Sequence, residues 1–309
     1  MSTTYSELRA QLATLTTEAF RPELAEIDRL STLEIAEIMN GEDRTVPAAV
    51  ARALPAIAAA IDATAERMAR GGRLLYLGAG TAGRLGVLDA SECPPTFNTD
   101  PEQVTGLIAG GPSAMVKAVE GAEDSKELAA ADLDALGVGP DDTVVGVSAS
   151  GRTPYAIGAV EHARAAGALT IGLSCNADSA LAAAAEHGIE VVTGPELLTG
   201  STRLKAGTAQ KLVLNMISTI TMIRLGKTYG NLMVDVRASN EKLQARSRRI
   251  VALATGAPDE RIEAALAAAG GEVKNAILII LADVDAATAA RRLKDSDGHL
   301  RAALHATAP

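Results

Sequence analysis

RLLYLGAGTAGRLGVLDASECPPT, residues 73–96, is the segment from which the architecture of this chain can be worked out. Its apolar run, Leu74 to Leu77, predicts a short buried strand. The glycine-rich turn Gly78–Gly83 follows, and the pattern from Arg84 to Leu88 is compatible with a helix. Such a turn brings free backbone N–H groups and the positive end of a helix to one point. The segment therefore predicts an anion site, most simply a phosphate site.

Glu92 lies a few residues beyond the predicted helix start. It is followed by Cys93, Pro94 and Pro95, and proline disfavours both helix interiors and central strands. We therefore expect this segment to be neither helix nor interior strand. A carboxylate held rigidly beside an anchored phosphate suggests an active site. Cys93 has no histidine nearby in the sequence, so a thiolate nucleophile is not expected.

Apolar runs and helical patterns alternate around this segment. Further strands are predicted at 104–109, 143–148, 169–173 and 189–192, and helices at 47–69, 113–120, 125–136, 154–166, 179–186 and 204–225. The apolar periodicity over 27–39 predicts one more helix, which begins near Ser31 and stops at Asn40-Gly41. This alternation is typical of a parallel sheet covered by helices on both faces. We predict an α/β fold with a doubly wound parallel sheet, which binds ligands at the carboxyl ends of its strands.

The sequence divides into three predicted parts. Residues 1–45 are assigned to an N-terminal helical arm, whose first 20 residues are expected to be a mobile arm or a short helix. Residues 46–238 are assigned to the α/β domain. Residues 239–309 are assigned to a small C-terminal helical bundle, because charged helical segments there are broken at 256–258, at 270–271 and near Asp283.

Composition excludes several classes of protein. The 309 residues carry a formal charge of −9, which argues against nucleic-acid binding because that needs a basic face. Cys93 and Cys175 cannot build a disulfide framework or a zinc quartet, and the four histidines show no metal-ligand spacing, so no metal is expected. No apolar run reaches the length of a membrane span, and no signal peptide opens the chain. We expect a cytoplasmic protein that binds neither nucleic acid nor membrane.

The glycine pattern at Gly78, Gly80 and Gly83 matches the dinucleotide fingerprint. That fingerprint also needs an acidic residue at the end of the second strand, and residues 107–111 read Leu-Ile-Ala-Gly-Gly. A nicotinamide or flavin site is therefore not expected. The P-loop pattern is absent from the sequence as well, so nothing favours ATP hydrolysis.

Three loops rich in small hydroxyl residues remain, at 80–83, 148–153 and 199–201. Hydroxyls and backbone N–H groups can bind a phosphate without a metal, but turns and helix caps use the same residues. Lys205 is either a phosphate partner or an exposed helix charge, and Lys211 is better explained as the latter. Glu92 and Glu123 are either catalytic carboxylates or ordinary loop acids.

At these motifs the sequence closely resembles N-acetylmuramic acid 6-phosphate etherases. The resemblance is carried by LGAGTAGRLGVLDASECPPTF (77–97), AVEGAEDS (118–125), VSASGRTPYAIGA (147–159), GSTRLKAGTAQKLVLNM (200–216) and GNLMVDV (230–236). It implies a sugar isomerase (SIS) domain, a flavodoxin-like or Rossmann-like three-layer sandwich that binds phosphosugars. The implied reaction releases D-lactate from N-acetylmuramic acid 6-phosphate and leaves N-acetylglucosamine 6-phosphate, in peptidoglycan recycling. The resemblance also implies a homodimer and no cofactor.

By motif match, the resemblance makes Glu92 a proton donor and Glu123 a second catalytic acid. It implies substrate-binding positions at Gly80, Thr81, Ala82, Gly83, Ser148, Ser150, Gly151, Arg152, Thr153, Ser201 and Lys205. Ala82 departs from the family, whose first loop commonly has serine there, and this loss of a hydroxyl bears on affinity more than on reaction type. Two alternatives stay open: a non-catalytic SIS-type regulator that binds phosphosugars, and a sugar-phosphate isomerase.

Overall fold

The computed structural model describes residues 10, 12–236 and 241–305. The arm predicted at 1–20 therefore lies partly outside the described residues. The chain forms two compact units. The first comprises Met1–Ser91 and Glu102–Ser218, and the second comprises Glu92–Pro101 and Thr219–Pro309. Each unit is described by itself below. The division into an arm, an α/β domain and a helical bundle stays a prediction.

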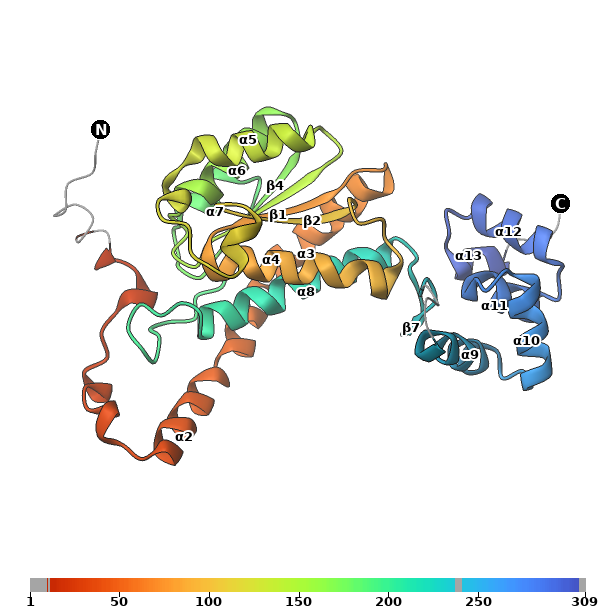
Figure 1. The fold of residues 1–309 in the computed structure, drawn as a ribbon, viewed down its shortest axis with the longest axis horizontal. Helices are drawn as coiled ribbons and strands as arrows, with labels where there is room; N and C mark the ends of the chain where they lie inside the picture. Colours follow the sequence, from red (N-terminus) through yellow and green to blue (C-terminus); the bar gives the residue numbers. More distant parts are fainter. Residues whose placement is uncertain (1–9, 11, 237–240, 306–309) are drawn as a thin grey trace. The chain divides into compact units, whose positions relative to one another are not determined.

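The first unit is built on a five-stranded parallel sheet with the order β2-β1-β3-β4-β5. Figure 1 labels β1, β2 and β4 of this sheet. The strands are β1 (Leu74–Gly78), β2 (Val104–Ile108), β3 (Thr143–Val147), β4 (Leu169–Ser174) and β5 (His187–Glu190). Every residue of β1, β3 and β4 is buried, which explains why these strands read as continuous apolar runs. The predicted parallel sheet is confirmed.

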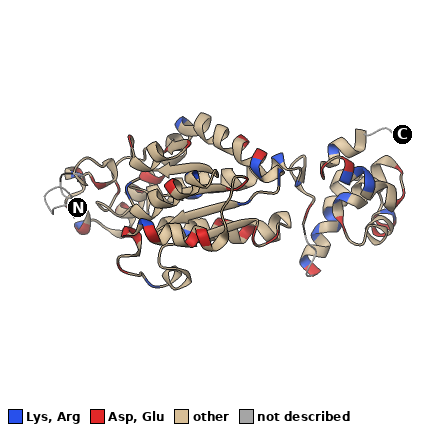
Figure 2. Cartoon of the chain, turned by 90° about the horizontal axis from the view of Figure 1, so that it is seen from above, with Lys and Arg blue, Asp and Glu red and all other residues tan. Residues whose placement is uncertain are grey.

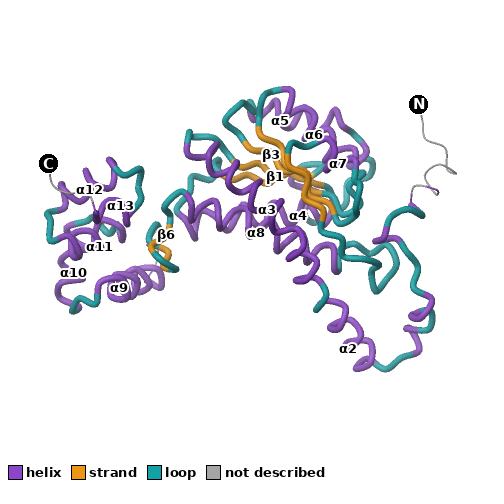
Figure 3. Tube along the Cα trace, turned by 180° about the vertical axis from the view of Figure 1, so that it is seen from behind, coloured by secondary structure: helices purple, strands orange, loops and turns teal. Residues whose placement is uncertain are grey.

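Helices cover both faces of this sheet, as Figures 1 and 3 show. One face carries α3 (Val46–Ala69), α4 (Gly80–Phe97) and α8 (Lys205–Arg224), and the other carries α5 (Lys126–Leu136), α6 (Pro154–Ala165) and α7 (Ala180–Ala184). Helix α4 begins close to β1 because Gly83 has no side chain. A Cβ there would lie 2.5 Å from the carbonyl oxygen of Gly78. The doubly wound arrangement predicted from the sequence is therefore confirmed.

Helix α2 (Thr32–Asp43) is preceded by the 3₁₀ turns η1 (Thr16–Glu18), η2 (Pro22–Leu24) and η3 (Ile27–Arg29). A capping box between Ser31 and Glu34 begins it. We expected a stop near Gly41, but one glycine costs a helix only about 1 kcal/mol and the helix continues. The stretch Thr32–Ala69 is long and apolar enough to cross a membrane, a property it shares with core helices. In this structure, α3 buries one face in the first unit.

The segment between β2 and α5 contains less helix than we expected. Only η4 (Pro112–Met115) and η5 (Ala122–Asp124) form there, both as 3₁₀ turns. Gly111 and Gly121, at the beginning of the two turns, have φ of 72° and 74°. Glycines with positive φ interrupt a helix, and the segment between these two glycines is too short to gain much from helix propagation. The predicted helix at 113–120 is therefore wrong.

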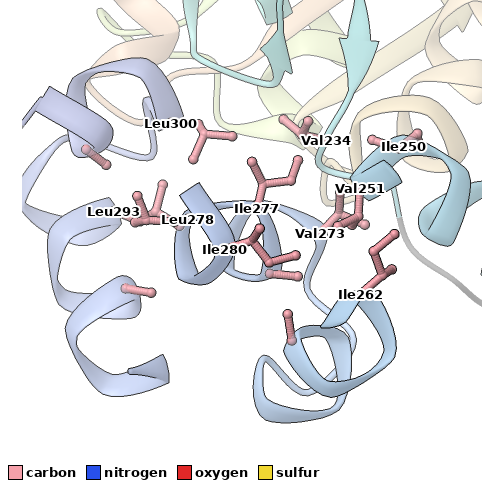
Figure 4. Packing of buried hydrophobic residues seen from close by; sticks show 14 of the residues in the cluster. Val234, Ile250, Val251, Ile262, Val273, Ile277, Leu278, Ile280, Leu293 and Leu300 are labelled. Atoms are coloured by element: carbon pink, nitrogen blue, oxygen red, sulfur yellow. The ribbon is translucent and has the colours of Figure 1, made fainter. Parts of the chain in front are cut away.

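The second unit contains a short antiparallel pair, β6 (Thr228–Tyr229) and β7 (Leu232–Met233), and a set of helices. These are α9 (Glu241–Thr255), α10 (Asp259–Ala268), α11 (Val273–Ala282), α12 (Ala286–Asp295) and α13 (Leu300–His305). Figure 4 shows the apolar core they share, with Ile277 and Leu278 of α11 fully buried. Acidic and basic residues are interspersed along the helices (Figure 2). The predicted helical character is confirmed for residues 241–305.

Asp89 links α4 to β1 and α8 inside the first unit. Its carboxylate accepts hydrogen bonds from Tyr76 Oη (2.8 Å), Asn215 Nδ2 (2.6 Å) and Ser218 Oγ (3.1 Å). The side chain is buried, and this burial raises its pKa against the lowering effect of the three hydrogen bonds. The three bonds hold the helix that begins at the glycine turn against its neighbours.

Replacing Asp89 by alanine is expected to lower the free energy of unfolding by about 3 kcal/mol, because three donors lose their acceptor. Asp89→Asn keeps one acceptor oxygen and should cost about 1 kcal/mol. Urea unfolding of both variants measures the difference. Equal stability of the alanine variant and the unmodified chain would contradict this structural role.

Candidate active site

A cavity of about 720 Å³ opens in the first unit, next to the carboxyl ends of β1 and β3. It is lined by residues of both loops that follow these strands, by residues before α2 and by residues in and before α8. This is the position at which doubly wound sheets bind their ligands. The predicted site residues that line it are Gly80, Thr81, Ala82, Glu123, Ser148, Ser150, Arg152 and Thr153.

The first loop places the start of α4 at the cavity. Gly80 adopts a φ of 53°, and it has open space where a side chain would lie. Thr81 and Ala82 belong to the first turn of the helix and line the cavity. The first backbone N–H groups of a helix have no partner within the helix, so they are available to an anion.

The second loop gathers hydroxyl groups at the start of α6. Ser148 Oγ lies 2.8 Å from Thr153 Oγ1 and 3.2 Å from Ser150 Oγ, and it accepts a hydrogen bond from the backbone N–H of Gly151 (3.1 Å). Gly151 has a φ of 67°, and a Cβ there would lie 2.4 Å from Ser179 Cβ. Only glycine therefore permits this compact loop. Hydroxyls arranged in this way can rotate to donate to a bound oxyanion.

The charges around the cavity do not favour anion binding by themselves. Arg152 lines it together with three acidic residues, which are Glu18, Glu123 and Asp124. A phosphate in this cavity would therefore be bound chiefly by hydroxyls, backbone N–H groups and the N-terminal ends of α4 and α6. Binding by neutral, oriented donors needs no metal ion.

Glu123 lies in η5, between two anchoring residues. Ala122 is buried before it, and Ser125 caps α5 by accepting a hydrogen bond from the backbone N–H of Leu128 (3.0 Å). The Glu123 side chain itself is exposed and lines the cavity. A carboxylate on a short, anchored turn is suited to proton transfer at a ligand in this cavity.

Glu92 lies in α4, about three helical turns beyond Gly80, and its side chain is exposed. It is not one of the residues that line the cavity. Our expectation that its segment is not helical is wrong, because α4 continues through Pro94 and Pro95 to Phe97. The φ of proline suits a helix, although each proline lacks the N–H that would donate to a carbonyl one turn earlier. Burial of Cys93 and Phe97 favours the helical conformation further.

Four of the predicted substrate-binding positions do not line the cavity. Lys205 is buried, and its Nζ forms an ion pair with Glu42 Oε2 at 2.6 Å. Its backbone N–H donates to Glu196, which also accepts from Ala206 at the start of α8. The others are Gly83, Gly151 and Ser201, and the two glycines shape the loops that do line it. Lys211 is exposed, as we expected.

The sequence interpretation missed several lining residues. Among them are Leu12, Leu15 and Glu18, which precede η2. This segment is held by Asn176, whose Oδ1 accepts hydrogen bonds from Thr16 N (2.8 Å) and Thr16 Oγ1 (2.9 Å). No sequence signal connects residues so far apart. Thr202 and Gln210 were also missed, although both fall within the quoted motif at 200–216.

The chain matches two family profiles. The profile of the glucokinase regulatory protein N-terminal SIS domain matches residues 56–164, and that of the SIS domain matches residues 119–220. Among solved structures, a phosphoheptose isomerase from Francisella tularensis is similar at 20% identity with a TM-score of 0.45. The similarity covers 61% of this chain and 98% of that chain.

Relatives of known name are similar over nearly the whole chain. An N-acetylmuramic acid 6-phosphate etherase of Streptomyces avermitilis is 82% identical over 302 residues, which are 98% of this chain and 97% of the relative. Etherases of the same name from Rubrobacter xylanophilus and Escherichia coli O17:K52:H18 are 62% and 55% identical, each over 95% of this chain. They are covered over 97% and 99% of their own lengths.

Proposed function

Because the chain belongs to the family of N-acetylmuramic acid 6-phosphate etherases, we propose that the cavity of its first unit is the active site. The chain is a carbon–oxygen lyase that cleaves the D-lactyl ether of N-acetylmuramic acid 6-phosphate, giving N-acetylglucosamine 6-phosphate and D-lactate in amino-sugar recycling. One observation carries the proposal: a carboxylate, Glu123, lines the same cavity as the hydroxyl loop of Ser148, Ser150 and Thr153.

The hydroxyl loop and the start of α4 bind the 6-phosphoryl group in this proposal. Thr81, Ser148, Ser150 and Thr153 supply hydroxyl donors, and the N-terminal ends of α4 and α6 supply backbone N–H groups. Arg152 adds one positive charge at the edge of the loop. Anchoring the phosphate holds the sugar at a constant distance from Glu123, which converts proton transfer into an intramolecular step.

The reaction requires proton transfer at two adjacent carbons. In the ring-opened sugar, the C2 hydrogen is acidic because C2 is next to the C1 aldehyde, and a base removes it. The C3–oxygen bond then breaks, the electron pair leaves with the lactyl oxygen, and an acid protonates that oxygen. Water adds its oxygen to C3, and a proton returns to C2. This sequence needs two carboxyl groups in different protonation states.

We assign the C2 proton transfer to Glu123 and the protons of the leaving group and of water to Glu92. Glu123 is assigned by its position in the cavity. Glu92 is assigned by motif match, and it does not line the cavity of its own chain. We therefore propose a homodimer in which Glu92 of a second copy completes the site. An exposed carboxylate on a long helix is suited to this role.

The proposed location is the cytoplasm. Cys175 is a buried free thiol, and this is the usual state of cysteine in a reducing compartment. We further propose that residues 46–238 form the SIS domain, since the matched profiles fall within this range, with residues 1–45 as an arm and 239–309 as a helical domain.

Release of D-lactate tests the function directly. Purified protein incubated with N-acetylmuramic acid 6-phosphate is expected to form D-lactate and N-acetylglucosamine 6-phosphate in equal amounts, measured with D-lactate dehydrogenase. A phosphosugar-binding regulator or an aldose–ketose isomerase releases no lactate. Binding of the phosphosugar without lactate formation would therefore contradict the lyase activity and favour one of these alternatives.

A further inference from the structure

Gln210 is a buried polar residue whose hydrogen-bonding capacity is not met within the described part of the chain. It lies on α8 with 1% of its surface exposed, and its Nε2 has no hydrogen-bond partner among the described residues. The side chain lines the cavity of the first unit. Buried donors without a partner are rare in native proteins because they cost free energy. An acceptor from a bound ligand would remove that cost.

The surroundings of Gln210 on α8 show which part of the cavity it reaches. Gly207 lies one turn earlier on the same face, and a Cβ there would be 3.4 Å from Thr81 Cγ2. Ala206 and Ala209 are buried beside it. This face of α8 is therefore packed against the first loop. The hydroxyl loop, which also lines the cavity, leads into α6, and α6 covers the opposite face of the sheet (Figures 1 and 3).

We propose that Gln210 positions the sugar part of the substrate, with Nε2 donating a hydrogen bond to a neutral oxygen, a hydroxyl or the acetamido carbonyl. The phosphoryl group already has donors from the hydroxyl loop and from two helix N-termini. Gln210 lies inside α8, where the N–H groups of its own helix are not free, and its carboxamide is uncharged. This inference rests on the proposed binding of a phosphosugar in the cavity.

The variant Gln210→Met tests the proposal, because methionine has a similar length and no donor. The KM for N-acetylmuramic acid 6-phosphate and the inhibition constant of N-acetylglucosamine 6-phosphate are each expected to rise about tenfold. Inhibition by inorganic phosphate should stay unchanged. The Tm should not fall, since the substitution removes an unsatisfied buried donor. Lys211→Met, at the exposed neighbouring position of α8, is the matched control and should leave all four quantities unchanged.

Three results would overturn the assignment. If inhibition by inorganic phosphate weakens as much as inhibition by N-acetylglucosamine 6-phosphate, Gln210 contacts the phosphoryl group or shapes its loop. A clear fall in Tm would mean that the residue has a structural role. Unchanged constants for both phosphosugars would mean that it does not contact the substrate. If the unmodified protein binds neither inorganic phosphate nor N-acetylglucosamine 6-phosphate, the proposed phosphosugar site is wrong. This result is obtained without the Gln210 variant, so it is distinct from a failure of the Gln210 assignment.

Discussion

Glu123→Gln is expected to release D-lactate about 10²–10⁴ times more slowly than the unmodified chain, because a positioned general acid or base contributes a factor of this size. Glutamine keeps the shape of the side chain but can neither take up nor release the C2 proton. Glu123 lies on η5 at the cavity and is held there by the buried Ala122. The substitution should therefore leave the KM for the phosphosugar nearly unchanged and lower kcat.

Glu127→Gln is the matched control for this experiment. Glu127 lies in the first turn of α5, close to Glu123 in the sequence, is exposed and does not line the cavity. Its replacement should leave kcat within a factor of about two, since surface substitutions of this kind have small effects. A Glu123→Gln variant with a rate within tenfold of normal would remove Glu123 from the mechanism.

Mixing two inactive variants is expected to restore about a quarter of the normal activity. Glu92→Gln and Glu123→Gln each lack one carboxylate, so each homodimer should be inactive. If Glu92 of one copy completes the cavity that holds Glu123 of the other, a mixed dimer has one intact site and one site without either glutamate. Random exchange makes about half of the dimers mixed, and half of their sites work. The product is about one quarter.

The experiment requires exchange of subunits, so the two variants are unfolded together and refolded, or co-expressed with different tags. Each variant treated alone is the control and should stay inactive. If the mixed sample remains inactive although mixed dimers are isolated by their tags, both carboxylates act from the same chain. If Glu92→Gln alone turns over normally, Glu92 has no catalytic role and the proposed composite site is wrong.

The sheet and the phosphate loops were predictable from the sequence because their signals are local. Apolar runs such as Leu74–Leu77 are buried strands, and the glycine turn after this run does begin a helix at the cavity. The hydroxyl loop at 148–153 lies beside it, since β1 and β3 are neighbours in the sheet. The helix predicted at 113–120 was wrong because glycines with positive φ outweigh a weak periodic pattern.

The family, the parallel α/β fold and the two loops of small and hydroxyl residues at the cavity could be read from the sequence, since these depend on local patterns and on long motifs. Three features became visible in the folded chain alone: the ion pair of Lys205 with Glu42, the continuation of α4 past Glu92 through two prolines, and the buried donor of Gln210 at the cavity. Ion pairing, packing and unmet hydrogen bonds depend on residues far apart in the chain. Only folding brings those residues together.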